Sequence, residues 1–268
     1  MRRILALLPL DWFLFGLLLV AAAAGALAAA SLHLPGIFMV VPVAALLGGF
    51  VYLRPGRRRA VGLRRAAERL GLTYEGKGNP FAGDPDFDRR HFELLWRPDT
   101  TYGFAVRHLV RGHSSVGEVC LFDFRYNSVD ANSFDQTVAV FCLAGSLPQF
   151  SIVPKGVLER AFFAAASAVG LKRDIDFPSQ PGFTRRQLVR GPDESAVRTL
   201  FSAPVLELWG SLEPREWSAC GAGRWLLVYR DHHLVPPRQL SGFLRQAEII
   251  ARAFAGEVTA RLAQRSPL

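Results

Sequence analysis

Three ionisable side chains are the best candidates for catalysis in this sequence: Asp123, Asp135 and His108. Each falls in or beside one of three neighbouring extended segments, so a sheet could bring them together. Carboxylates and imidazoles are the groups that enzymes use most often to move protons. Their spacing along the chain does not pair them, however, so they are weak candidates for acid–base chemistry.

The other residue types that carry chemistry do not form a recognisable site. Each of the three cysteines lies alone inside a predicted strand, as expected of buried thiols in a reducing compartment. The sequence has no phosphate-binding loop, dinucleotide fingerprint or serine-nucleophile elbow. A zinc site needs several ligands at a defined spacing, whereas the histidines are scattered over positions 33, 91, 108, 113, 232 and 233. We therefore expect no metal and no cofactor.

The basic charge of the chain is concentrated near its beginning. The formal net charge is +9 and the isoelectric point is about 10.2, but residues 60–268 account for only +4 of that charge. A small excess of scattered arginines without a recognition motif argues against nucleic-acid binding. Six arginines form a cluster after the second apolar run: Arg54, Arg57, Arg58, Arg59, Arg64 and Arg65. The cluster could contact anionic lipid headgroups, or it could serve only as a topology signal.

Two apolar runs near the start explain the positive mean hydropathy of +0.17. Residues 12–30 and 33–53 contain one ionisable side chain, His33, and the first run would span roughly 28 Å as a helix. Arginines flank both runs, and the loop between them has none. By the positive-inside rule, this pattern predicts a transmembrane hairpin in a bacterial inner membrane with both termini cytoplasmic.

The hairpin prediction leaves two questions open. The first run also resembles a cleavable signal peptide, although Pro9 and Asp11 interrupt it and another apolar run follows. Both runs are rich in alanine and glycine, so the helices could pack on each other or form an oligomer. We place the domain boundary after residue 56, with residues 57–268 forming a cytoplasmic domain.

The pattern of the remaining residues predicts an α+β domain: an antiparallel sheet packed with about four helices. Period-two alternation predicts strands at 102–110, 116–126 and 136–143, with a hairpin turn at 112–115. Shorter strands are expected at 73–75, 92–96, 150–153 and 183–189, and a hairpin is expected over 217–220 and 225–229. Helical periodicity is found in residues 58–70, 157–169, 193–201, 205–212 and 240–262. The string Leu-Val-Arg-Gly occurs at 109–112 and 188–191, which raises the question of an internal duplication.

Several short motifs resemble a group of uncharacterised bacterial membrane-anchored proteins. The motifs are Leu121-Phe122-Asp123-Phe124-Arg125-Tyr126, Gln136-Thr137-Val138, Leu147-Pro148-Gln149-Phe150 and Ile152-Val153-Pro154. The resemblance implies an apolar hairpin before a cytoplasmic α+β domain. It implies no activity, since the motifs are of a structural rather than a catalytic kind.

Three functions are compatible with these observations. The first is a membrane-anchored, non-enzymatic module that binds or scaffolds a partner protein or a ligand near the lipid bilayer. The second is an enzyme acting on a membrane-associated substrate, with the three candidates named above. The third is a structural subunit of a membrane assembly, in which the small residues of the hairpin mediate contact between copies or subunits.

Overall fold

The computed structural model describes residues 56–81, 92, 104–127, 133–155, 173–212 and 216–265. The chain divides into two compact units, Met1–Val61 and Gly62–Leu268. The predicted membrane spans 12–30 and 33–53 lie outside the described residues. Within the described residues, no helix has both the length and the apolar character that crossing a membrane requires.

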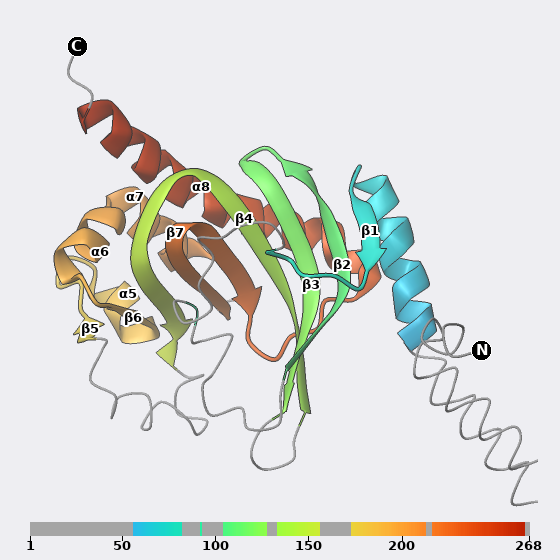
Figure 1. Ribbon diagram of the computed structural model, residues 1–268. Coiled ribbons are helices and arrows are strands. Elements are labelled where there is room, and N and C mark those ends of the chain that lie inside the picture. Colours follow the sequence, from blue (N-terminus) through green and yellow to red (C-terminus); the bar gives the residue numbers. More distant parts are fainter. Residues whose placement is uncertain are drawn as a thin grey trace, which may run out of the picture. The chain divides into compact units, whose positions relative to one another are not determined.

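The second unit contains a seven-stranded antiparallel sheet (Figure 1). Its strand order is β1-β2-β3-β4-β6-β5, with β7 paired to β4. This sheet confirms the predicted α+β class. The strands are β1 (Thr73–Gly76), β2 (Phe104–Ser114), β3 (Gly117–Asn127), β4 (Ser133–Pro154), β5 (Arg173–Ile175), β6 (Gln187–Gly191) and β7 (Trp217–Arg230).

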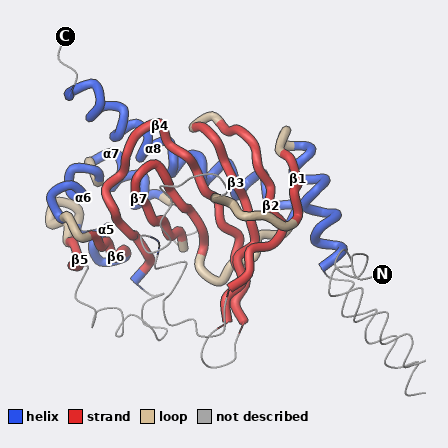
Figure 2. The backbone as a smooth tube through the Cα atoms, in the orientation of Figure 1, coloured by secondary structure: helices blue, strands red, loops and turns tan. Residues whose placement is uncertain are grey.

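Strands β4 and β7 are long arches that run side by side (Figures 1 and 2). The expected hairpin over 217–220 and 225–229 is therefore wrong, and the expected strands 136–143 and 150–153 are parts of one strand. Gly221 does not form a turn: it lies opposite Phe150, and a Cβ there would be 2.2 Å from the ring. The curl of β7 brings Cys220 Sγ to within 4.0 Å of the Tyr229 hydroxyl.

Helices and the core beneath them cover one face of the sheet. A helix spans residues 56–69, and its part within the second unit buries Leu63, Ala66 and Ala67. Residues 183–186, expected in a strand, instead end a helix, because Pro181 starts it and Phe183 packs into the core. The remaining helices are α5 (Pro181–Arg186), α6 (Glu194–Leu200), α7 (Ala203–Ser211), the 3₁₀ turn η3 (Pro237–Gln239) and α8 (Leu240–Arg265).

The predicted helices 193–201 and 240–262 are confirmed in type and place. Asp193 caps α6, with its Oδ1 accepting a hydrogen bond of 2.9 Å from the Ala196 N–H. In α8, Ala247, Ile250 and Phe254 are fully buried at helical spacing. The predicted helix at 157–169 and the strand at 92–96 lie outside the described residues, apart from Phe92.

A second apolar cluster occupies the opposite face of the sheet. It includes Phe122 and Val140 from the strands, and Phe81 and Phe92 from the chain between β1 and β2. Phe81 packs edge-to-face on Phe122 and on Trp225, with centroids 6.4 and 5.5 Å apart. Both faces of the sheet are thus buried, which accounts for the apolar residues at consecutive positions of β3.

The two Leu-Val-Arg-Gly strings occupy equivalent places in β2 and β6. Each string pairs antiparallel with the short strand that precedes it, β1 or β5. Each arginine forms an ion pair with an acidic residue of that short strand: Arg111 with Glu75 at 3.3 Å, and Arg190 with Asp174 at 2.6 Å. The two ion pairs differ in register, because Arg190 lies directly opposite Asp174 whereas Arg111 lies opposite Thr73, so they add no support to an internal duplication.

Candidate functional site

Asp135 forms an ion pair with Arg125, directly across the β3–β4 ladder. Arg125 Nε and Nη2 donate to the two carboxylate oxygens at 2.6 and 2.5 Å, a bidentate arrangement. The Arg125 side chain is 38% exposed and the Asp135 side chain 30%. The carboxylate is held by its neighbour at the edge of the protein, and its catalytic role stays a prediction.

Asp123 lies on the same face of the sheet but is buried. Thr137, its partner across the ladder, donates a hydrogen bond of 3.0 Å to Asp123 Oδ1. The same hydroxyl accepts a hydrogen bond of 3.0 Å from the Val235 N–H, and the Thr137 N–H donates to the His233 carbonyl. Asp123 therefore belongs to a buried network that fastens the segment after β7 to β4.

His108 points away from both aspartates. It sits at a β-bulge of β2 with a φ of +56°, which turns its ring toward β1. There its Nδ1 is 2.8 Å from the Tyr74 hydroxyl. Because β1 and β3 flank β2 on opposite sides, the three predicted catalytic residues do not converge.

The basic cluster is only partly within the described residues. Arg54 lies outside them, Arg57 and Arg58 are exposed, and Arg59 is half-buried. In the second unit Arg64 and Arg65 are exposed, and the Arg64 guanidinium lies 5.4 Å from the centroid of the Tyr74 ring. The predicted contact of this cluster with lipid remains untested.

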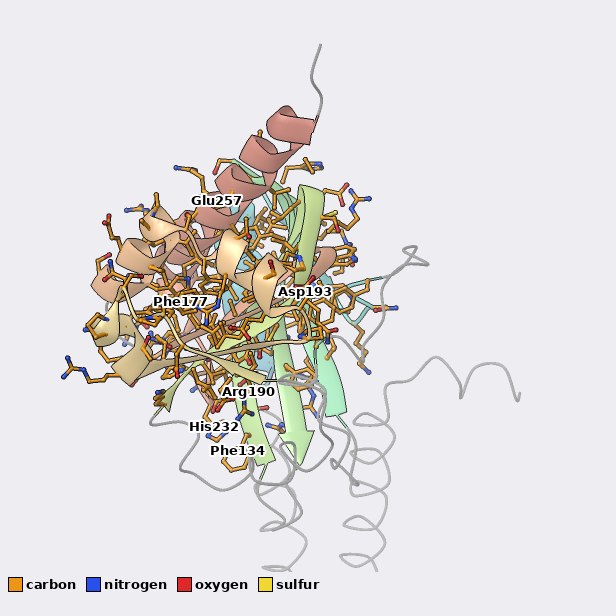
Figure 3. The ribbon with its side chains drawn as sticks, turned by 90° about the vertical axis from the view of Figure 1, so that its left-hand side faces the viewer. Phe134, Phe177, Arg190, Asp193, His232 and Glu257 are labelled. Atoms are coloured by element: carbon orange, nitrogen blue, oxygen red, sulfur yellow. The ribbon has the colours of Figure 1, made fainter. Side chains whose placement is uncertain are left out.

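Aromatic and polar side chains also meet beside the start of β4. The His232 ring stacks on Phe134 with centroids 4.1 Å apart (Figure 3), and the backbone N–H of His232 donates to Gln136 Oε1 at 3.2 Å. Beside it, burial and the nearby Arg230 charge lower the pKa of His233. These contacts hold the segment after β7 against the start of β4.

A hollow of about 400 Å³ opens on the face of the sheet that carries the second apolar cluster. This volume lies within the range of small-molecule sites. We call it the β-hollow. Its lining comprises Thr73, Glu75, Pro80, Arg111, Gly112, His113, Glu118, Val119, Cys120, Val140 and Trp225.

Strand register explains why these residues meet. Directly opposed residues of antiparallel strands share a face, and two adjacent cross-strand rows form the floor of the β-hollow. The first row runs Thr73, Arg111, Cys120, Val140, and the second runs His113, Glu118, Cys142, Trp225. Residues from β1, β2, β3, β4 and β7 are thereby gathered without any loop being needed to place them.

The polar groups of the β-hollow differ in their pairing. Arg111 Nε lies 3.3 Å from Glu75 Oε1, and its Nη2 donates to the Asn79 carbonyl at 3.1 Å. Glu118 and His113 are exposed, and neither side chain makes a hydrogen bond or ion pair with any residue in the described part of the chain. Among the described residues, Glu118 is the acidic group of the β-hollow whose carboxylate has no counter-ion.

Cys120 forms an apolar part of the floor. Burial raises the pKa of its thiol to about 12, against a smaller lowering by the Arg111 charge. Such a thiol stays protonated at neutral pH and is a poor nucleophile. Across all described residues, no group of three or more potential metal ligands occurs. The β-hollow is therefore suited to binding a ligand through charge and apolar contact.

Sequence reasoning missed the β-hollow, although one signal was present. Residues 111 and 113 in one strand and 118 and 120 in the next are spaced two apart, so a tight turn between the strands places all four on one face. We expected the turn at 112–115, whereas the chain turns at 115–116, and Ser114 pairs with Gly117. The Ser114 hydroxyl stabilises this tighter turn by accepting from the Val116 N–H at 3.2 Å. Had we predicted this two-residue turn, the register would have placed His113 opposite Glu118, as the structure has it.

Comparison with known proteins adds little to this geometry. The structure is similar to the crystal structure of the mycobacterial trehalose monomycolate transport factor A, TtfA, at 16% identity and a TM-score of 0.48. The alignment covers 75% of this chain and 92% of that one. No protein-family model and no curated protein matches the chain. A likeness at this level assigns no function.

Proposed function

We propose that this protein is a membrane-anchored binding module whose ligand site is the β-hollow. In this proposal the hairpin of residues 12–30 and 33–53 holds the chain in a bacterial inner membrane, and the α+β domain lies in the cytoplasm. The arginine cluster lies against the lipid surface. Binding, rather than catalysis, is the role of the domain.

One observation carries the proposal: a hollow of about 400 Å³ combines the apolar side chains of Cys120, Val140 and Trp225 with the Glu118 carboxylate, which has no counter-ion among the residues that the structure describes. Such a carboxylate forms no ion pair that stabilises the described part of the protein, but it can fix the orientation of a ligand of opposite charge. The catalytic candidates contribute nothing there, since Asp123, Asp135 and His108 are not among the lining residues. The non-enzymatic reading is favoured for that reason.

Anchoring can be tested separately from binding. The full chain should stay with membranes after alkaline carbonate washing and dissolve only in detergent. A reporter enzyme that is active only in the cytoplasm should show activity when it is fused after Leu268. Release by carbonate, or activity only in the periplasm, would overturn the anchor or its orientation.

Binding is tested by native mass spectrometry of the full chain. The protein, extracted in dodecyl maltoside from membranes of its own host, should carry a small molecule. The double variant Glu118→Gln, Trp225→Phe should lose this molecule. Glu207→Gln, which neutralises an exposed carboxylate of α7 outside the β-hollow, should retain it. A wild-type chain that carries nothing, or a molecule equally abundant in all three proteins, argues against the β-hollow as the site.

A further inference from the structure

The charge of the β-hollow indicates what kind of ligand it takes. The described part of its lining contains one arginine and two glutamates, which leaves one carboxylate in excess of the guanidinium. The Arg111 guanidinium is already engaged by Glu75 and by the Asn79 carbonyl. Glu118 therefore supplies the charge that remains for a ligand.

The Trp225 indole lies on the same face of the sheet as the Glu118 carboxylate, with one strand between them. Glu118 and Trp225 both lie opposite Cys142, one on each side of it, so their backbones are roughly 10 Å apart, twice the spacing of neighbouring strands. Their side chains rise from the same face, with the Cys142 side chain between them. Phe81 packs edge-to-face on Trp225 and supports the indole from the side of the second apolar cluster.

An acidic group and an indole on either side of the Cys142 side chain form an arrangement suited to an organic cation. The carboxylate neutralises the charge, and the electron-rich indole attracts the alkyl groups and the positive centre together. An anion would meet the uncompensated Glu118 and would have to displace Glu75 from Arg111. A neutral sugar would not neutralise the Glu118 charge.

We propose, on the basis of the binding function proposed above, that the β-hollow binds an organic ammonium group between Glu118 and Trp225. The group could belong to a free amine or to the headgroup of a phospholipid. In both cases the recognised chemistry is the same: a substituted ammonium whose charge meets Glu118 and whose carbon substituents meet Trp225.

The test is a titration of the full chain in dodecyl maltoside, a detergent without an ammonium group. The readout is the indole N–H signal of Trp225 in ¹H–¹⁵N spectra, identified by its loss in Trp225→Phe. The probes are tetramethylammonium chloride, phosphocholine and inorganic phosphate, each against sodium chloride at equal ionic strength. tert-Butanol serves as an uncharged molecule of similar shape.

We expect tetramethylammonium and phosphocholine to shift the Trp225 signal in a saturable way, and phosphate and tert-butanol to leave it unchanged. Tighter binding of phosphocholine would identify a headgroup as the source, and equal binding would identify the ammonium alone. Glu118→Gln should weaken both several-fold, the effect of losing one ion pair with an exposed carboxylate. Glu207→Gln should match the wild type.

Three results would overturn the ammonium proposal. They are a Trp225 shift with phosphate alone, an equal shift with tert-butanol, or unchanged affinity in Glu118→Gln. If none of the cations shifts Trp225 while the co-purifying molecule still depends on Glu118 and Trp225, the ligand class is wrong and the binding function stands. If that molecule is also absent, both proposals fail.

Discussion

Replacing Gly221 with alanine tests the unbroken course of β7 through a position where the sequence suggests a turn. The added Cβ would lie 2.2 Å from Cε1 of Phe150 and 3.0 Å from a Leu147 methyl carbon. The ring cannot withdraw, because it is fully buried between Phe201 and Phe254, with centroids 5.3 and 5.0 Å away. Overpacking of this kind costs about 1–3 kcal/mol. We expect the upper end of that range, about 3 kcal/mol.

Urea unfolding of the full chain in detergent, followed by tryptophan fluorescence, measures this cost. With a slope of about 2–3 kcal/mol per molar urea, the midpoint should fall by roughly 1 M. Gly223→Asn is the matched control: Gly223 has a φ of +57° and open space around it, and asparagine tolerates that conformation. Its midpoint should hardly move.

The double variant Gly221→Ala, Phe150→Leu separates the clash from other causes. A smaller side chain opposite residue 221 should recover part of the loss, so the two substitutions should be non-additive. If Gly221 instead belonged to an exposed turn, alanine would cost less than about 0.5 kcal/mol and the two changes would add independently. That outcome would refute the arched strand.

Three further predictions concern single side chains. Thr137→Val removes the hydroxyl that joins Asp123 to the Val235 N–H, so unfolding in urea should show a loss of about 1–3 kcal/mol; unchanged stability would mean that the network does not hold the segment after β7. Because burial raises the pKa of Cys120 to about 12 and the other two thiols are also buried, Ellman's reagent at pH 8 should detect none of the three cysteines in the native protein and all three in guanidinium; rapid native reaction would contradict this burial. Since the pKa of His233 is lowered on folding, the unfolded chain binds the proton more readily, and stability should decrease as pH falls below about 6.5; His233→Gln should flatten that part of the profile, and an identical profile in the variant would refute the assignment.

The elements that sequence predicted well are those whose signals are local. The apolar residues of α8 repeat at helical spacing over many turns, and Asp193 marks the start of α6 with its own side chain. The strands β2, β3 and the first part of β4 are rich in β-branched and aromatic residues over enough positions to identify them. Local patterns of this kind need no knowledge of partners.

What could not be predicted depends on packing between distant segments. Gly221 looks like a turn residue, and only its closeness to Phe150 shows that it serves a tight contact within a strand. Likewise, Glu118 and Trp225 share a site because β4 pairs with β3 on one side and with β7 on the other. Neither residue carries a motif, and a register error of one residue would have sent Glu118 to the opposite face.

The most direct measurement of the central claim is photo-crosslinking from Thr73, an exposed residue on the rim of the β-hollow. A benzophenone amino acid at this position, in the full chain within living cells, should attach to a small molecule that mass spectrometry detects. The same amino acid at the exposed Thr199 of α6 should not. Adding Glu118→Gln and Trp225→Phe should abolish the product at Thr73. Equal products at both positions, or a product at Thr73 that survives both substitutions, would contradict the account.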